Sequence, residues 1–231
     1  MSRVLPILFN TDMVRAILDG RKTVTRRVAK KIPAETSRIE PVQPFDGGNL
    51  KFECHWGGYM PDVQGFKDGM AVVKPPYQPG NILYVRETWG DYRECQEGGC
   101  GYYMYRADYP DGATAYLYDE GTVCDLPRWH PSIHMPKDAA RIWLKVTDVR
   151  VERLQDIDEE QAKKEGGINN IGFIHSPENE YENLHTTRED FKENIWNSTI
   201  KKSDLYCYGW DANPWAWVIW FERCEKPSAS P

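Results

Sequence analysis

The sequence lacks long hydrophobic runs and the common motifs of nucleotide-hydrolysing and zinc-dependent enzymes. No stretch approaches the roughly 20 apolar residues that cross a bilayer. Asn10, Asp12 and Arg15 interrupt the N-terminal segment where a signal peptide would be apolar. The glycine patterns of dinucleotide and ATP sites, the HExxH pair and internal repeats are also missing. We therefore expect a cytoplasmic protein that contacts no membrane and uses no cofactor.

An excess of positive charge is lacking as well. The formal net charge is −6, which argues against broad binding along long duplex DNA. Residues 1–30 nevertheless hold seven Lys or Arg against two Asp, a local charge of +5. A basic segment on an acidic chain suits a small anionic ligand or a short stretch of nucleic acid, although it is also typical of a solvated helix face.

What the sequence does contain is enough apolar material for a core. Of its 231 residues 40 % are hydrophobic, with nine Trp and thirteen Tyr, which excludes a disordered chain. Candidate strands are unevenly spaced and accompanied by short helices. This pattern favours a mixed α+β fold, mainly β, over a doubly wound sheet. We expect a single domain over residues 1–231 with insertions at 30–78 and 90–130.

Three short helices are expected from their end signals. Thr11 is a suitable N-cap for an amphipathic helix that Gly20 ends. Asp158 followed by Gln161 resembles a capping box, and Gly166 stops that helix. Thr186 or Thr187 caps the third.

Strands are expected where apolar residues are dense or alternate, at residues 82–89, 102–106, 141–152 and 214–222. The phase of the alternation changes at Thr147 and Asp148, which indicates a bulge or turn. Residues 28 to about 80 are weakly patterned and are interpreted as loop or insertion, and residues 168–186 are interpreted as a polar loop.

Several segments together resemble one family. They are Gly20–Arg27 (GRKTVTRR), Tyr84–Trp89 (YVRETW), Pro131–Pro136 (PSIHMP) followed by Arg141, Asn213–Ile219 (NPWAWVI), and the short helix that ends at Gly166. In this order they resemble the ASCH family in its long, prophage-encoded form. The resemblance implies a PUA-like β-barrel with short flanking helices and a cleft that is associated with RNA or modified nucleobases.

One branch of that family is an N4-acetylcytidine amidohydrolase built on a Lys, a Thr and a Glu, which correspond to Lys22, Thr25 and Glu165. The chemistry is reasonable without a metal, because a buried lysine of lowered pKa can act as a base. Glu165 would then transfer a proton or orient a water. The alternatives are phosphate attraction for Lys22, a strand-end hydrogen bond for Thr25 and a surface carboxylate for Glu165.

Other side chains are candidates for ligand binding. Charges at Arg86 and Glu87 lie in an apolar strand, where they are costly unless they are paired or face a cleft. Trp89, Tyr208 and Trp210 are candidates for stacking a base, whereas Trp215, Trp217 and Trp220 are interpreted as core. The remaining candidates are Arg21, Arg26, His134 and Arg141.

The six cysteines are expected to be reduced. Cys95, Cys100, Cys124 and His130 offer four ligands of the types that bind zinc, but the spacing is not a CxxC pattern. Free thiols are the preferred interpretation.

The sequence thus predicts a phage or prophage protein that binds RNA or a modified nucleobase or nucleoside in a PUA-like cleft. Two alternatives remain open. One is an amidohydrolase of N4-acylated cytidine that uses Lys22, Thr25 and Glu165, and the other is a phage accessory protein that binds a protein partner.

Overall fold

The structure is a computed structural model that describes residues 3–42, 48–57, 59–60, 65–66, 69–91, 103–118, 122–126, 128–167, 170–176 and 179–227. The chain divides into two compact units. Unit 1 comprises Met1–Gly20, Asn81–Lys145 and Glu222–Pro231, and unit 2 comprises Arg21–Gly80 and Val146–Phe221.

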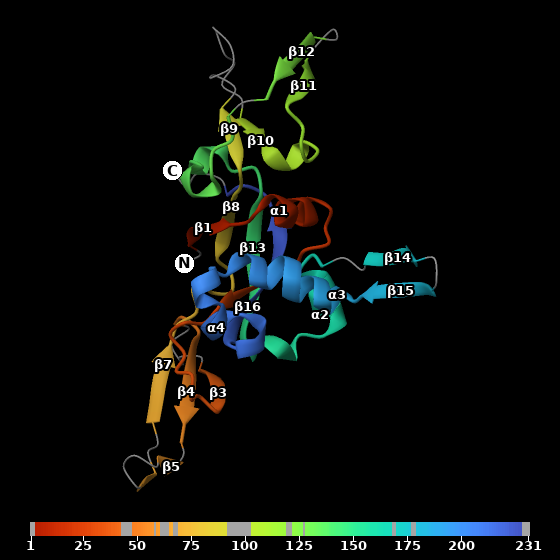
Figure 1. The fold of residues 1–231 in the computed structure, drawn as a ribbon. Coiled ribbons are helices and arrows are strands. Elements are labelled where there is room, and N and C mark those ends of the chain that lie inside the picture. Colours follow the sequence, from red (N-terminus) through yellow and green to blue (C-terminus); the bar gives the residue numbers. More distant parts are fainter. Residues whose placement is uncertain are drawn as a thin grey trace. The chain divides into compact units, whose positions relative to one another are not determined.

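Unit 1 is built on strands that pair in the order β1-β8-β13 (Figure 1). β1 (Val4–Leu8) runs parallel to β8 (Ile82–Arg86), and the first residues of β13 (Trp143–Arg153) run antiparallel to β8. Two hairpins follow, formed by β9 (Trp89–Asp91) with β10 (Tyr103–Tyr105) and by β11 (Ala115–Tyr118) with β12 (Thr122–Asp125).

The helices of unit 1 are short. They are α1 (Thr11–Leu18) and the 3-10 turns η3 (Arg106–Asp108), η5 (Ser132–His134) and η6 (Lys137–Ala139). Met135, Ala139, Ala140 and Trp143 form a buried cluster in this unit.

Unit 2 contains strands in the order β13-β16-β2, where β2 (Val24–Val28) runs antiparallel to β16 (Trp215–Cys224). Its helical elements are η7 (Leu154–Asp156), α2 (Glu159–Lys164), α3 (Thr187–Asp190), the π-helical turn η8 (Phe191–Asn197), η9 (Lys202–Asp204), α4 (Leu205–Tyr208) and η10 (Trp210–Ala212). Leu154, Phe191, Trp196 and Trp210 lie at the centre of its buried core.

Residues 28 to about 80, interpreted as loop or insertion, contain a separate antiparallel sheet in unit 2, so this segment is not loop throughout. β3 (Arg38–Val42), β4 (Lys51–Trp56) and β7 (Gly69–Val73) pair in that order, as the orange strands of Figure 1 show, and β5 (Tyr59–Met60) pairs with β6 (Gly65–Phe66). Only Phe52, Cys54 and Val73 of this sheet are buried. Because so few side chains of this sheet are buried, its sequence shows little alternation between apolar and polar residues.

The prediction of loop at 168–186 is also wrong. β14 (Asn170–Ser176) and β15 (Asn179–His185) pair over their full length as an antiparallel hairpin. Backbone hydrogen bonds define this ladder, so polar sequences such as those of β15 can form it.

The expected helix ends are mostly confirmed. Gly20 has φ of 75° and follows α1, and Gly166, with φ of 96°, follows α2. Asp158 caps α2 by accepting from the Gln161 amide, and Thr186 caps α3 in a full capping box. The N-cap of α1 is Asn10 and not Thr11, because the Asn10 side chain accepts from the Met13 amide.

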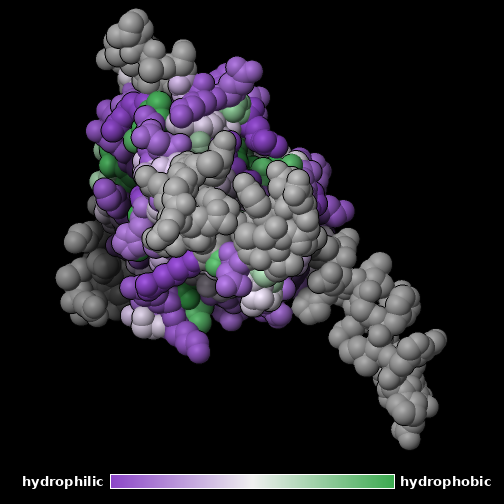
Figure 2. Space-filling model, turned by 90° about the horizontal axis from the view of Figure 1, so that it is seen from above, coloured by the Kyte–Doolittle hydropathy of each residue, from purple (hydrophilic) through white to green (hydrophobic). Residues whose placement is uncertain are grey.

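The mixed α+β class, mainly strand, is confirmed. Within the described ranges every sheet is open and none closes into a barrel. No described helix combines the length and the hydrophobicity required to cross a membrane. The coloured atoms on the face drawn in Figure 2 are mostly hydrophilic, with small hydrophobic spots between them.

Candidate functional site

Lys22 and Glu165 meet inside unit 2. Lys22 precedes β2 and its side chain has no exposed surface, while Glu165 is the C-cap of α2 and is 2 % exposed. The Lys22 Nζ donates to Glu165 Oε2 at 2.7 Å and to the Glu165 backbone carbonyl at 2.8 Å. Two residues 143 positions apart in the sequence therefore form a buried ion pair.

Arg26 completes this arrangement from the same face of β2. Its Nη1 donates to Glu165 Oε1 at 3.3 Å. Its Nη2 donates to Glu152 Oε2 at 3.0 Å and to Gln161 Oε1 at 2.6 Å. Each oxygen of the Glu165 carboxylate thus has a cation beside it. We call Lys22, Arg26, Glu152, Gln161 and Glu165 the Glu165 cluster.

The backbone holds the segment before β2 against the end of α2. The Thr23 amide donates to the Lys164 carbonyl at 2.9 Å, and Arg21 Nη1 donates to the Gly166 carbonyl at 3.1 Å. These bonds satisfy carbonyls that the last turn of a helix leaves unpaired. Arg21 is exposed, in contrast to Lys22 and Arg26.

Burial lowers the pKa of Lys22. Loss of solvent lowers the pKa of Lys22 from its usual range, and the nearby Arg27 and Arg26 guanidiniums lower it further, whereas the Glu165 carboxylate opposes the shift. A lysine of lowered pKa that touches a carboxylate has the property required of a general base.

Thr25 lies on the other face of β2. It is buried and opposite Ile219 in the ladder with β16. Successive side chains of a strand point to opposite faces, so Thr25 points away from the face on which Arg26 reaches Glu165. Among the described residues, no hydrogen bond joins the Thr25 hydroxyl to Lys22 or Glu165. The structure therefore brings together two of the three expected catalytic residues.

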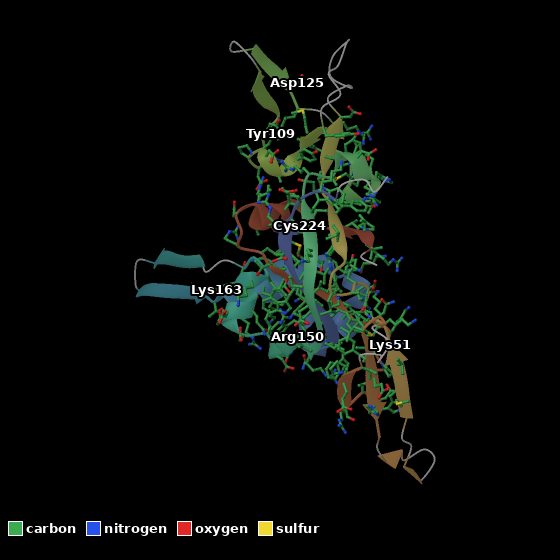
Figure 3. All side chains as sticks on the ribbon, turned by 180° about the vertical axis from the view of Figure 1, so that it is seen from behind. Lys51, Tyr109, Asp125, Arg150, Lys163 and Cys224 are labelled. Atoms are coloured by element: carbon green, nitrogen blue, oxygen red, sulfur yellow. The ribbon has the colours of Figure 1, made fainter. Side chains whose placement is uncertain are left out.

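A cavity of about 430 Å³ lies beside the Glu165 cluster in unit 2. We call it the Trp220 cavity, and it is lined by Thr147, Asp148, Arg150, Asp158, Glu160, Gln161, Lys164 and Trp220. Gln161 belongs to both the cavity and the cluster, because its side-chain oxygen accepts from Arg26. Figure 3 labels Arg150 on β13 at this part of unit 2.

The cavity contains none of the residues that the sequence singled out as a site. Trp220 was interpreted as core, but it is only partly buried and contributes to the cavity wall. The change of phase at Thr147 and Asp148 was the one available signal, since both line the cavity. The adjacency of β13, α2 and β16 at this place could not be read from the sequence.

The charged candidates in unit 1 form a separate network. Arg141 donates from Nε and Nη2 to the two oxygens of Glu87 at 3.0 Å each, and from Nη1 to Asp108 at 2.7 Å. Its guanidinium lies 3.9 Å from the centroid of the Tyr105 ring. Burial raises the pKa of Glu87, and the hydrogen bonds from Arg141 oppose that shift.

Arg86 donates to the carbonyls of Met135 (2.9 Å) and Ile133, which fixes the segment around η5. Arg86 thus holds the segment around η5, while Glu87 and Arg141 form a separate ion pair within unit 1.

The remaining aromatic candidates differ in accessibility. Trp89 is partly buried against Tyr103 and His130, with ring centroids 5.6 and 5.0 Å away. His134 is exposed in η5. Trp210 is 8 % exposed, packs edge-on against Phe191 and carries the Arg188 guanidinium 4.8 Å from its centroid, so it belongs to the core of unit 2.

The zinc hypothesis falls largely outside the described residues. Cys95 and Cys100 lie beyond them, and the side chain of Cys124 is not described either. His130 packs on Trp89. The part of the chain that the structure describes contains no group of three or more His, Cys, Asp or Glu able to hold a metal ion.

No family model, curated protein or solved structure matches this chain.

Proposed function

We propose that the protein binds a nucleobase or nucleoside, free or as part of a short RNA, through the polar groups around Glu165 in unit 2, and that its fold is PUA-like and of the ASCH type. The observation that supports this best is the 2.7 Å contact between Lys22 and Glu165. The family resemblance led us to expect that these two residues meet, although they are far apart in the chain.

The chemistry of the cluster suits a heterocyclic edge. A base such as cytosine presents an amino donor next to ring and carbonyl acceptors. Glu165 can accept from the amino group, while Lys22 and Arg26 supply donors for the acceptors. Buried ion pairs contribute little net stability, so exchanging one for a ligand with matching groups is not prohibitively costly.

A direct test is a calorimetric titration of the pure protein that measures its affinity for cytidine, N4-acetylcytidine, uridine, adenosine and a short single-stranded RNA. We expect saturable binding of at least one nucleoside, weakened ten-fold or more by Glu165→Gln. Lys163→Met, which changes an exposed lysine of α2, is the matched control and should leave binding unchanged. Absence of saturable binding for every ligand would overturn the proposal.

A second candidate function is hydrolysis of N4-acylated cytidine, and the lowered pKa of Lys22 favours it. In this reaction water adds to the acyl carbon, the bond from that carbon to N4 breaks, and N4 gains a proton. Cytidine and acetate are released. This requires that the proton Lys22 shares with Glu165 first moves to the carboxylate; neutral Lys22 would then accept a proton from the water, the protonated Glu165 would deliver one to N4, and the acetic acid formed releases its proton to solvent.

Chromatography of N4-acetylcytidine incubated with the protein tests this candidate. Turnover should be abolished by Lys22→Ala. Thr25→Val should reduce it less than ten-fold if Thr25 only supports β2, and far more if Thr25 is the nucleophile. Equal turnover by wild type and Lys22→Ala would rule the reaction out.

A further inference from the structure

The Trp220 cavity carries an inference that extends the proposed function. Its volume of about 430 Å³ lies within the range of small-molecule sites. Its wall combines one indole ring with carboxylates, cations and an amide, which come from β13, from α2 and its N-cap, and from β16. None of these residues was expected to bind a ligand.

Trp220 offers an aromatic surface with an unmet hydrogen bond. It stands opposite Val24 in the β16–β2 ladder and is only partly buried. Its indole Nε1 is buried, and no hydrogen-bond partner for it exists among the described residues. A buried donor without a partner is unfavourable, and it marks this side of Trp220 as incompletely satisfied.

Lys164 occupies the position in front of the ring. Its Nζ lies 5.3 Å from the Trp220 ring centroid and 2.6 Å from Glu160 Oε1. The Glu160 side chain is 76 % exposed and that of Lys164 is 39 % exposed. Exposed pairs of this kind contribute little to stability, so the ammonium can leave the ring at small cost.

The rim supplies both donors and acceptors. Arg150 Nε donates to Asp148 Oδ2 at 2.6 Å, and both side chains are well exposed. Asp158 accepts the Gln161 amide with one oxygen, Oδ1. Carboxylates around an aromatic ring favour a planar ligand that donates hydrogen bonds, while Arg150 and Lys164 can attract a phosphate.

We propose that the Trp220 cavity binds a nucleobase that carries an exocyclic amino group, stacked on the Trp220 ring in the place now taken by the Lys164 ammonium. This inference rests on the proposed function, namely that unit 2 binds a nucleobase, and it places the base in the cavity beside the Glu165 cluster and adds the stacking residue. In this site Asp148 and Asp158, in place of Glu165, accept from the amino group, and the sugar and phosphate face Arg150 and Lys164.

The chain offers a matched control for the stacking residue. Trp215 lies on the same strand, is also partly buried and also has an indole nitrogen without a partner among the described residues, but it does not line the cavity. The guanidinium of Arg153 covers it at 4.1 Å. Trp215→Ala therefore tests for general loosening of β16.

The experiment is a calorimetric titration with CMP, AMP, GMP and UMP. Because stacking on an aromatic side chain is typically worth 5-fold to 150-fold in affinity, we expect Trp220→Ala to weaken CMP binding by about ten-fold or more and Trp215→Ala to leave it nearly unchanged. Trp220→Phe, which keeps a ring, should retain most of the affinity. UMP, which lacks the amino group, should bind more weakly than CMP.

The outcomes separate this inference from the proposed function. Binding by wild type that is unaffected by Trp220→Ala, or weakened equally by Trp215→Ala, would overturn the Trp220 site and leave nucleoside binding elsewhere in unit 2 standing. Absence of binding by wild type would overturn both.

Lys164→Met removes the ammonium that competes for the Trp220 ring and should tighten binding of cytidine, which has no phosphate. A ten-fold weakening of cytidine binding would contradict stacking of the base in the place of the Lys164 ammonium.

Discussion

Glu165 is the residue on which the cluster in unit 2 depends. One buried carboxylate lies between the Lys22 ammonium and the Arg26 guanidinium, and its backbone carbonyl also accepts from Lys22. The pair itself is not a strong source of stability, because both ions lose hydration. Removing only one partner is different, since it leaves the other charge buried and uncompensated.

We therefore predict that Glu165→Gln lowers the free energy of unfolding by about 3–5 kcal/mol. Chemical denaturation followed by circular dichroism measures this value. Lys163→Met serves as the control, because Lys163 is exposed on α2, as labelled in Figure 3, and should change stability by less than about 0.5 kcal/mol. Similar losses in the two variants would mean that the Glu165 charge is not buried in solution.

Tyr105 gives a second prediction at the residue scale. Its hydroxyl donates to the Ala139 carbonyl at 2.7 Å, and burial raises its pKa to about 12. Because the folded pKa lies above the unfolded one, the stabilising contribution is complete below about pH 10 and is lost as the pH rises through 12.

The difference in ultraviolet absorbance between wild type and Tyr105→Phe, followed through an alkaline titration, reports this group. We expect the difference signal to develop near pH 12. Stability of Tyr105→Phe should also fall less steeply than that of wild type between about pH 10 and 12. A midpoint near 10 would show that Tyr105 is solvated.

At the scale of elements, helix ends were predictable and weak strands were not. Gly166 and the Asp158 cap act within a few residues, so the sequence alone contains their signal. The β3-β4-β7 sheet was missed because few of its residues alternate between core and solvent, and the β14–β15 hairpin was missed because its sequence is weakly patterned. Their pairing depends on backbone hydrogen bonds between segments, which local patterns do not encode.

Asn213 illustrates an element boundary that depends on one residue. It has φ of 43° and ψ of 53°, in the left-handed region, where it ends η10 before β16. Its Oδ1 also accepts the Gln155 amide at 2.9 Å. The backbone requirement favours Gly or Asn, and the hydrogen bond favours Asn or Asp.

We predict that Asn213→Asp is the mildest substitution, that Asn213→Gly costs about 1 kcal/mol for the lost hydrogen bond, and that Asn213→Ala costs about 2–3 kcal/mol because it adds left-handed strain. Thermal unfolding of the three variants gives the order. Equal losses for Gly and Ala would show that φ at this position relaxes.

For the whole molecule, the expectation that Lys22 and Glu165 meet came only from the family resemblance, and the sequence did not indicate the Trp220 cavity. Composition predicted a mixed fold with a core, and the mixed α+β class is confirmed. The cavity requires the neighbourhood of β13, α2 and β16, which is a property of the folded unit. A partly exposed Trp220 looks the same in sequence as the buried Trp217 three residues earlier.

The distribution of charge limits how strongly the protein can bind an RNA backbone. The basic N-terminal segment belongs to an acidic chain of net charge −6, and two of its cations, Lys22 and Arg26, are buried against Glu165. Buried cations do not contact phosphates. Unit 2 therefore has few cations at the proposed site for an RNA backbone, chiefly Arg150, Lys164 and the exposed Arg21.

Binding of a short single-stranded RNA should accordingly depend weakly on salt. Each phosphate neutralised on a single strand contributes about −0.7 to the slope of log K against log salt, so one to three contacts predict a slope of about −1 to −2. Binding of a nucleoside should show almost no dependence on salt. Replacing both Arg150 and Lys164 by Gln should flatten the RNA slope further while cytidine still binds. A slope steeper than about −4 would require a phosphate-binding surface beyond these cations and would contradict recognition centred on a single base.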